Sequence, residues 1–111
     1  MGSMIEVVAS IALVCSPLTR EEGRELVLLA PAVVTAAAAA GTEPSVQFKR
    51  IEAGAFVYRV SSVGGRLIGW YAVDELTGLV RDWITDSFPA VTTPPMANMQ
   101  RQLHIQRCRP R

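Results

Sequence analysis

The stretch that decides the fold is residues 55–84, which read AFVYRVSSVGGRLIGWYAVDELTGLVRDWI. Three of its segments are rich in aromatic and β-branched side chains, which favour β-strands: residues 55–60, 66–73 and 79–84. Short glycine-containing turns separate them, at residues 63–65 and 75–78. The stretch therefore predicts two or three antiparallel strands joined as hairpins. It also holds both tryptophans and both tyrosines, so we expect it to supply most of the aromatic core.

The composition indicates one compact domain. A chain of 111 residues is long enough for a hydrophobic core. The hydrophobic fraction of 50% and the charged fraction of 19% differ from those of a disordered protein. The net charge of +1 gives no general attraction to nucleic acid or an anionic membrane. Residues 101–111 hold four arginines and no acid, which leaves seven basic and ten acidic residues before them.

We expect three parts along the chain. Residues 1–3 resemble an expression scar, and residues 4–91 form a single α+β domain. Residues 92–111 form an extended, arginine-rich tail, in which residues 103–105 alternate as a short edge strand would. No secretion signal opens the chain, which favours a cytoplasmic location. The two apolar stretches of the chain, residues 5–14 and 26–40, are both shorter than the roughly 20 residues that a membrane span needs.

A helix is predicted over residues 20–40. Thr19 and Glu22 have the spacing of a capping box at its start, and Gly41 suits a left-handed cap at its end. Pro31 lacks a backbone N–H and therefore kinks the helix or splits it in two. One apolar stripe consists of Leu26, Leu29 and Val33. Because most of the remaining circumference is also apolar, the helix needs a cover besides the sheet, such as the N-terminal segment or a second subunit.

Two further segments complete the expected fold. Residues 5–14 alternate as a strand does but also form one helical face, and their β-branched content favours the strand. Residues 46–51 alternate up to Lys49 and then change phase, which indicates a strand with a bulge. The predicted fold is α+β, with one long proline-kinked helix packed on a curved antiparallel sheet of about four strands.

The two cysteines leave two interpretations open. Cys15 and Cys108 either form a disulfide that closes a long loop or remain two buried thiols. Met96, Met99 and His104 together with Cys108 offer ligand types that suit monovalent copper. Their spacing matches no metal-binding template, so we interpret the methionines as packing residues and predict no metal and no cofactor.

Candidate catalytic residues are few. His104 is the single histidine, and its apolar neighbours favour a structural role. Asp74 and Glu75 fall at a turn, where aspartate is favoured for its backbone hydrogen bonds. The sequence therefore predicts that the protein is not an enzyme.

Aromatic and arginine residues are the candidates for binding a protein partner. Strand alternation places Ile68, Trp70 and Ala72 on one face and Leu67, Tyr71 and Val73 on the other, so both faces are apolar. We expect a partner or a second copy of the chain to cover one of them. The predicted contact residues are Trp70, Tyr71, Trp83, Arg101, Arg107 and Arg109.

The hairpin motif resembles that of the PepSY domain. The matching residues are FVYRV at 56–60, Val73-Asp74 and Thr77-Gly78, with residues 19–40 as the preceding helix. The same pattern is also similar to the one in small immunity proteins that have a nuclear-transport-factor-like cone. Both resemblances imply a helix-on-curved-sheet fold of the cystatin-like or cone-like kind, and neither implies a catalytic residue.

These resemblances suggest what the protein does. We expect a non-enzymatic domain that occludes a partner protein, most concretely a bacterial immunity protein that neutralises a toxin. The alternative is a PepSY-like module that inhibits a peptidase or regulates envelope functions. A third reading is a small-ligand-binding cone or an enzyme. A homodimer is compatible with the first two.

Overall fold

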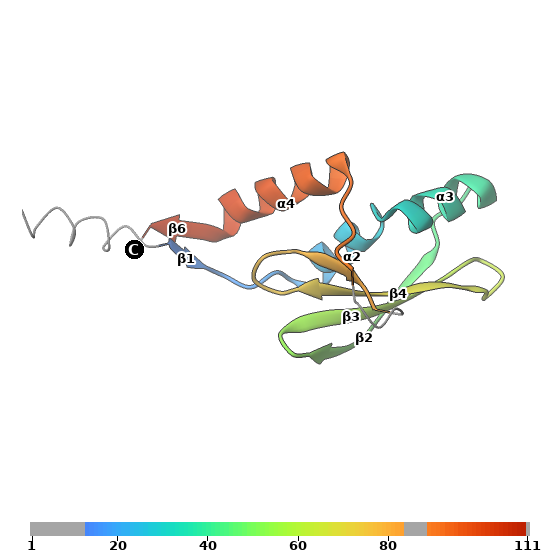
Figure 1. The fold of residues 1–111 in the computed structure, drawn as a ribbon, viewed down its shortest axis with the longest axis horizontal. Coiled ribbons are helices and arrows are strands. Elements are labelled where there is room, and N and C mark those ends of the chain that lie inside the picture. The colour runs from blue at the N-terminus through green and yellow to red at the C-terminus, as the bar shows by residue number, and fades with distance from the viewer. Residues whose placement is uncertain (1–12, 84–88, 111) are drawn as a thin grey trace, which may run out of the picture.

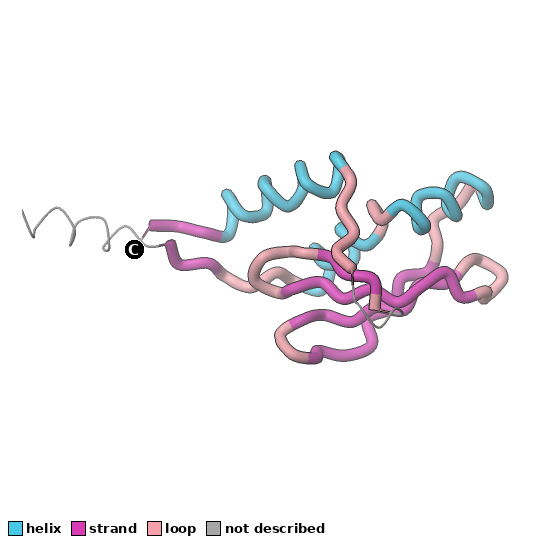
Figure 2. Tube along the Cα trace, in the orientation of Figure 1, coloured by secondary structure: helices cyan, strands magenta, loops and turns pink. Residues whose placement is uncertain are grey.

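The structure is a computed structural model that describes residues 13–83 and 89–110, and it has an α+β fold (Figures 1 and 2). In chain order the elements are β1 (Leu13–Cys15), α2 (Arg20–Val27), α3 (Pro31–Ala40), β2 (Ser45–Glu52), β3 (Ala55–Ser61), β4 (Leu67–Asp74), β5 (Val80–Asp82), α4 (Pro94–Arg107) and β6 (Cys108–Pro110). The helices lie on one side of the main sheet (Figure 1). The predicted α+β class is confirmed.

The main sheet is a four-stranded antiparallel meander, in the order β2-β3-β4-β5. The predicted turns are confirmed, and Gly65 and Gly78 adopt the positive φ values of 84° and 76° that such turns require. The predicted bulge in β2 is also confirmed, because the register against β3 shifts between Phe48 and Arg50.

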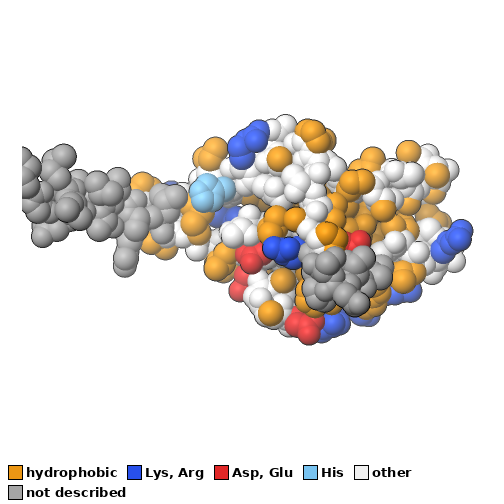
Figure 3. Space-filling view, in the orientation of Figure 1, with side chains coloured by type: hydrophobic (Ala, Val, Ile, Leu, Met, Phe, Trp, Pro, Cys, Tyr) orange, Lys and Arg blue, Asp and Glu red, His pale blue; other side chains and the backbone are white. Residues whose placement is uncertain are grey.

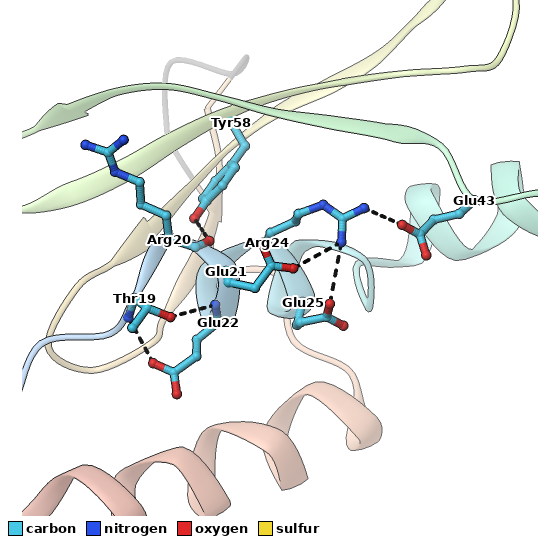
Figure 4. A network of polar contacts seen from close by, with 8 residues as sticks. All are labelled: Thr19, Arg20, Glu21, Glu22, Arg24, Glu25, Glu43 and Tyr58. Carbon is cyan, nitrogen blue, oxygen red and sulfur yellow. Dashed lines mark hydrogen bonds and ion pairs between the residues drawn. The ribbon is translucent and has the colours of Figure 1, made fainter.

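The hydrophobic core lies between this sheet and the helices. Its fully buried members include Leu26, Val27 and Val33 from the helices and Tyr58, Val60, Val73 and Val80 from the sheet. The Tyr58 hydroxyl donates a hydrogen bond of 2.6 Å to the backbone oxygen of Arg20, at the start of α2 (Figure 4). Burial, reinforced by the nearby charge of Glu21, raises the pKa of Tyr58 to about 12. Tyr58 therefore packs under α2 and also binds its first turn.

Of the two outcomes expected at Pro31, a kink or a split, the structure shows the split. The single long helix of the predicted fold is therefore wrong, since α2 and α3 are separate helices whose axes differ by 74°. Pro31 is the first residue of α3, where its missing N–H costs no hydrogen bond. Ala30 before it is extended, with φ −67° and ψ 142°, as a residue preceding proline prefers. Gly41 ends α3 in the predicted left-handed conformation, with φ 68°.

In the described ranges, no single helix has the length and apolarity to cross a membrane. The pair α2 and α3 meets those criteria only when counted together across its bend. Leu26 and Val27 of α2 and Val33 of α3 are buried within the protein's own core, which accounts for part of the apolar character of the pair.

The start of α2 is built as the sequence predicts. The Thr19 hydroxyl accepts from the Glu22 N–H, and the Glu22 carboxylate accepts from the Thr19 N–H, which is a complete capping box (Figure 4). Arg24 forms ion pairs with Glu25 and with Glu43, the latter in the loop after α3. The Glu43 hydrogen bond raises the pKa of Arg24. Because the two glutamates are exposed, these pairs add little to the stability of the fold.

The expectation of an extended tail over residues 92–111 is also wrong, since residues 94–107 form α4. Thr93 caps this helix, and its hydroxyl accepts from the Met96 N–H at 3.2 Å. Pro94 and Pro95 occupy the first turn, where proline favours a helix start rather than a break. Met96 and Leu103, seven residues apart, bury the inner face of α4.

The short strand near the C-terminus lies at residues 108–110 rather than at 103–105. This strand, β6, pairs antiparallel with β1, and a disulfide joins the paired residues Cys15 and Cys108. We call β1, β6 and the last turn of α4, residues 104–107, the arm. Figure 1 shows this part projecting from the sheet. The disulfide that the sequence left open is thus present. Residues 13 and 14 of the expected strand 5–14 belong to β1, and residues 5–12 lie outside the described ranges.

The different burial of Leu26, in α2, and Leu29, just after it, predicts that their truncation lowers the stability of the protein by different amounts. Leu26 is fully buried, whereas Leu29 is only partly buried against the core. Leu26→Ala should lower the free energy of unfolding by about 2–5 kcal/mol, as core truncations do, and Leu29→Ala should cost less. Chemical denaturation measures both. Equal costs, or a larger cost at Leu29, would contradict this placement.

The contact between Gly23 and Tyr58 gives a second prediction. A Cβ atom at position 23 would overlap the Tyr58 hydroxyl and lie 3.2 Å from Phe56 Cδ2. Gly23→Ala should therefore destabilise the protein by about 1–3 kcal/mol, although alanine favours a helix over glycine by about 1 kcal/mol.

A double-mutant cycle provides the control. In a Tyr58→Phe background the overlapping oxygen is absent, so Gly23→Ala should cost at least about 0.5 kcal/mol less than in the wild type. Denaturant titrations of the four proteins would supply the coupling energy. If the costs of the two substitutions were additive, overlap with the Tyr58 hydroxyl would not be the reason that Gly23→Ala destabilises the protein.

Candidate protein-binding site

The face of the sheet turned away from the helices carries Trp70. Tyr58 and Tyr71 pair across β3 and β4 and both belong to the core. Arg59 and Trp70, the next pair along the ladder, therefore face the opposite side, because successive residues of a strand alternate. We call this side the outer face.

A bulge in β4 changes the alternation that the sequence predicts. The register between β3 and β4 shifts between Val60 and Ser61, which leaves Ile68 as the extra residue. Leu67 consequently shares a depression with Trp70, and Ile68 packs against the core instead. The prediction that Ile68 lies with Trp70 and Leu67 opposite is wrong for this reason.

Trp70 and Trp83 lie together on the outer face. The backbone N–H of Trp83 donates to the Trp70 oxygen at 2.9 Å, which extends the β4–β5 pairing by one residue. Their side chains, with Arg50 and Leu67, line an open depression of about 350 Å³, which we call the tryptophan depression. Leu67 is 46% exposed. Two predicted contact residues thus meet at one apolar surface.

A row of four residues crosses the sheet beside this depression. Arg50, Val57, Ala72 and Arg81 are consecutive cross-strand partners from β2 to β5. Val57 and Ala72 are buried, at 0% and 3% exposure, so only the two arginines at the ends of the row reach the surface. Figure 3 shows acidic side chains as well as lysine and arginine side chains along the lower margin of the molecule, the side on which β2 lies in Figure 1. The exposed apolar part of the outer face is therefore the tryptophan depression, with charges of both signs around it and Arg50 paired with Glu52 at 3.1 Å.

A second, smaller depression adjoins the first. It encloses about 190 Å³, and Trp83 lines both. Its polar lining comes from Glu52, Asp74 and Arg81. Asp74 Oδ1 accepts hydrogen bonds from the N–H groups of Leu76 and Thr77, at 2.9 and 2.8 Å, so this carboxylate serves the turn, as the sequence suggests.

Tyr71, a third predicted contact residue, lies on the inner face. Only 5% of it is exposed, and it packs with Val73 and Val80 in the core. Burial, and then the negative charge of Asp82, raises the pKa of Tyr71. The helices cover this tyrosine, so it supports the outer face from below and does not reach its surface.

The predicted arginines are on α4 and the arm, separate from the two tryptophans. Arg101 lines a depression of about 480 Å³ on α4, together with Thr77, Ala97, Gln100, His104 and Ile105. Arg107 donates to the backbone oxygens of Ser16 and Leu76, at 2.5 and 3.3 Å, so it joins β1, α4 and the β4–β5 turn. Arg109 is exposed in β6. None of the three lines the tryptophan depression, which has Arg50 instead.

The four residues considered for metal binding lie in two separate places, the methionines in or against the core and His104 beside Cys108. Met96 is fully buried in the core and Met99 packs against it, as expected of packing residues. His104 Nδ1 lies 3.3 Å from the Cys108 sulfur, because residues four apart share one side of a helix. The methionine–histidine–cysteine set therefore does not converge on one point.

Sequence reasoning missed Arg50 and Leu67. Arg50 follows the bulge in β2, and the bulge at Ile68 brings Leu67 onto the outer face. The phase change near Lys49 was a visible signal for the first bulge. The smooth apolar run LIGWYAV at 67–73 contains no comparable signal for the second.

No family model, curated protein or solved structure matches the chain. Inferences about what the protein binds therefore rest on its own geometry.

Proposed function

We propose that the protein is a non-enzymatic protein-binding domain that engages its partner through the outer face of the sheet. The observation that carries this proposal is the tryptophan depression, in which Trp70, Trp83 and Leu67 meet beside Arg50. Tryptophan and arginine are the residues that contribute most to the energy of protein interfaces.

The shape of the depression favours a protein over a small ligand. Small-molecule sites enclose most of their ligand's surface. The tryptophan depression is open, and it continues past Trp83 into the smaller one. A protruding apolar side chain of a partner fits such a surface, with its surrounding main chain resting on the rim.

The charge of the outer face indicates the kind of partner. Arg50, Arg59 and Arg81 share this face with the acids Glu52 and Asp74, and Arg50 pairs with Glu52 at 3.1 Å, which leaves an excess of basic side chains. An acidic surface with one apolar anchor complements this arrangement, and opposite charges mainly raise the association rate. A toxin neutralised by an immunity protein is the most concrete such partner, and a peptidase held by a PepSY-like domain is the alternative.

The helix α3 adds a second apolar surface. Its ten residues carry no charge, and Val33 is its one buried residue, while Val34 is 48% exposed. This exposed surface is consistent with the proposal that the protein works in a complex.

Site-directed photo-crosslinking tests the proposal in the cells that make the protein. A photoreactive amino acid replaces Leu67, which lines the tryptophan depression, or Ile105, which is 74% exposed on α4. We expect position 67 to form a discrete protein adduct and position 105 to form none. Trp70→Ala with Trp83→Ala should weaken binding of the identified partner at least about 30-fold, the loss typical of hot-spot residues.

The same experiment distinguishes the alternatives. An adduct with a second copy of the chain would identify the outer face as a homodimer contact. Adducts that form at position 105 alone, or that persist at position 67 in the double tryptophan variant, would refute the proposed surface. Circular dichroism of each variant checks that the partly exposed tryptophans are not needed for folding.

A further inference from the structure

We infer that Cys15, Cys108 and His104 form a zinc site when the disulfide is reduced. The chain contains two cysteines and one histidine in all. The structure brings these three side chains together at the base of the arm, with their two sulfur atoms and an imidazole nitrogen within 4.8 Å of one another. This inference is independent of the proposed protein-binding face.

The distances fit tetrahedral zinc after a small change. With Zn–S bonds of about 2.3 Å and Zn–N bonds of about 2.0 Å, neighbouring sulfur and nitrogen ligands lie about 3.5 Å apart, and two sulfurs about 3.8 Å apart. His104 Nδ1 is already 3.3 Å from Cys108 Sγ. The two sulfurs, now covalently bonded, move apart once that bond is reduced.

The backbone holds the three ligands in place without the disulfide. Cys15 and Cys108 are direct partners in the β1–β6 pairing, and the Cys108 N–H donates to the His104 oxygen. The Ser16 N–H donates to the Arg107 oxygen at 3.0 Å, and the Arg107 side chain donates back to the Ser16 oxygen. These bonds keep the two chain segments adjacent after reduction, so the ligands are positioned before a metal arrives.

The site is accessible from one side. His104 is exposed and Cys15 is partly exposed, whereas Cys108 is buried at 9%. Figure 3 shows the single histidine, in pale blue, at the surface where the arm meets the body. His104 also lines the depression of about 480 Å³ on α4. Three protein ligands therefore leave one coordination position for water.

The chemistry balances with a dithiol as the reductant. One thiolate of the dithiol attacks a sulfur of the Cys15–Cys108 bond, and the other cysteine leaves as a thiolate that takes a proton. The second thiol of the dithiol then attacks the mixed disulfide and releases the remaining cysteine as a thiolate, which also takes a proton. The reductant thus supplies two electrons and departs as a disulfide. Zinc displaces both cysteine protons and binds His104 in its neutral form.

The disulfide and the zinc site are thus alternative states of the same residues. A disulfide sulfur carries no negative charge and is a poor zinc ligand, since the thiolate is the metal-binding form. A structural disulfide has no need of a neighbouring imidazole, whereas a zinc site of two cysteines does need a third ligand. The placement of His104 is what distinguishes this disulfide from a purely structural one.

Cobalt titration of the reduced protein tests the inference. The full chain is reduced with a phosphine, which is removed without oxygen before Co²⁺ is added. We expect one equivalent to bind, with thiolate-to-cobalt charge-transfer absorption and the visible bands of tetrahedral Co²⁺, and Zn²⁺ to displace it. The oxidised protein should show neither signal.

Matched variants of α4 identify the third ligand. His104→Ala should weaken Zn²⁺ binding by the reduced protein at least about 100-fold, because loss of a mere outer-shell partner already costs 10- to 100-fold. Gln102→Ala, an exposed change on the same helix, should leave the affinity unchanged. Zn²⁺ should also raise the Tm of the reduced wild type and not that of His104→Ala.

Two results would overturn the inference. The first is a reduced wild-type protein that gives no tetrahedral Co²⁺ spectrum and no rise in Tm with Zn²⁺, which includes the case in which reduction unfolds the arm irreversibly. The second is a His104→Ala variant that binds Zn²⁺ as tightly as the wild type, since the two cysteines would then act alone.

Discussion

The packing of α2 on β3 is the contact on which the rest of the structure depends. Tyr58 is 1% exposed, and its hydroxyl is satisfied by the Arg20 carbonyl, so a large aromatic ring is buried without an unpaired polar group. Gly23 permits this approach, because any side chain there would meet that hydroxyl. Leu26 then fills the space beyond it, at 0% exposure. One turn of helix thereby fixes which face of the sheet becomes the core.

That choice assigns different roles to the two faces and to the arm. The inner face is committed to packing, which leaves Trp70 and the residues around it on the outer face for contact with a partner. The arm adds little to the core, and it is held by the β1–β6 pairing and the hydrogen bonds of Arg107 in addition to the Cys15–Cys108 bond. A segment held by one covalent bond and a few hydrogen bonds is well placed to respond to redox conditions. The proposed binding surface and the proposed zinc site therefore lie in separate parts of the molecule.

Local signals in the sequence predicted the local structure well. The hairpin turns, the capping box at Thr19 and the left-handed Gly41 each depend on residues a few positions apart. The failures involve features that only the packed structure decides. The alternation at residues 103–105 looks like a strand, yet these residues are helical, and Leu103 is buried in the core together with Met96, which lies two turns away on the same face of α4. Likewise, no local sequence pattern predicts the bulge at Ile68 or the position of Trp70 beside Arg50.

Native-state hydrogen exchange tests the dependence on α2 most directly. The Leu28 amide, which donates to the Arg24 oxygen at 3.1 Å, reports on α2, and the Tyr58 amide reports on the centre of the sheet. If docking of α2 holds the fold together, both amides exchange through the same opening, with a free energy equal to that of global unfolding. A Leu28 amide that exchanges through a much smaller opening while Tyr58 stays protected would contradict the account, because the sheet would then persist without its helix.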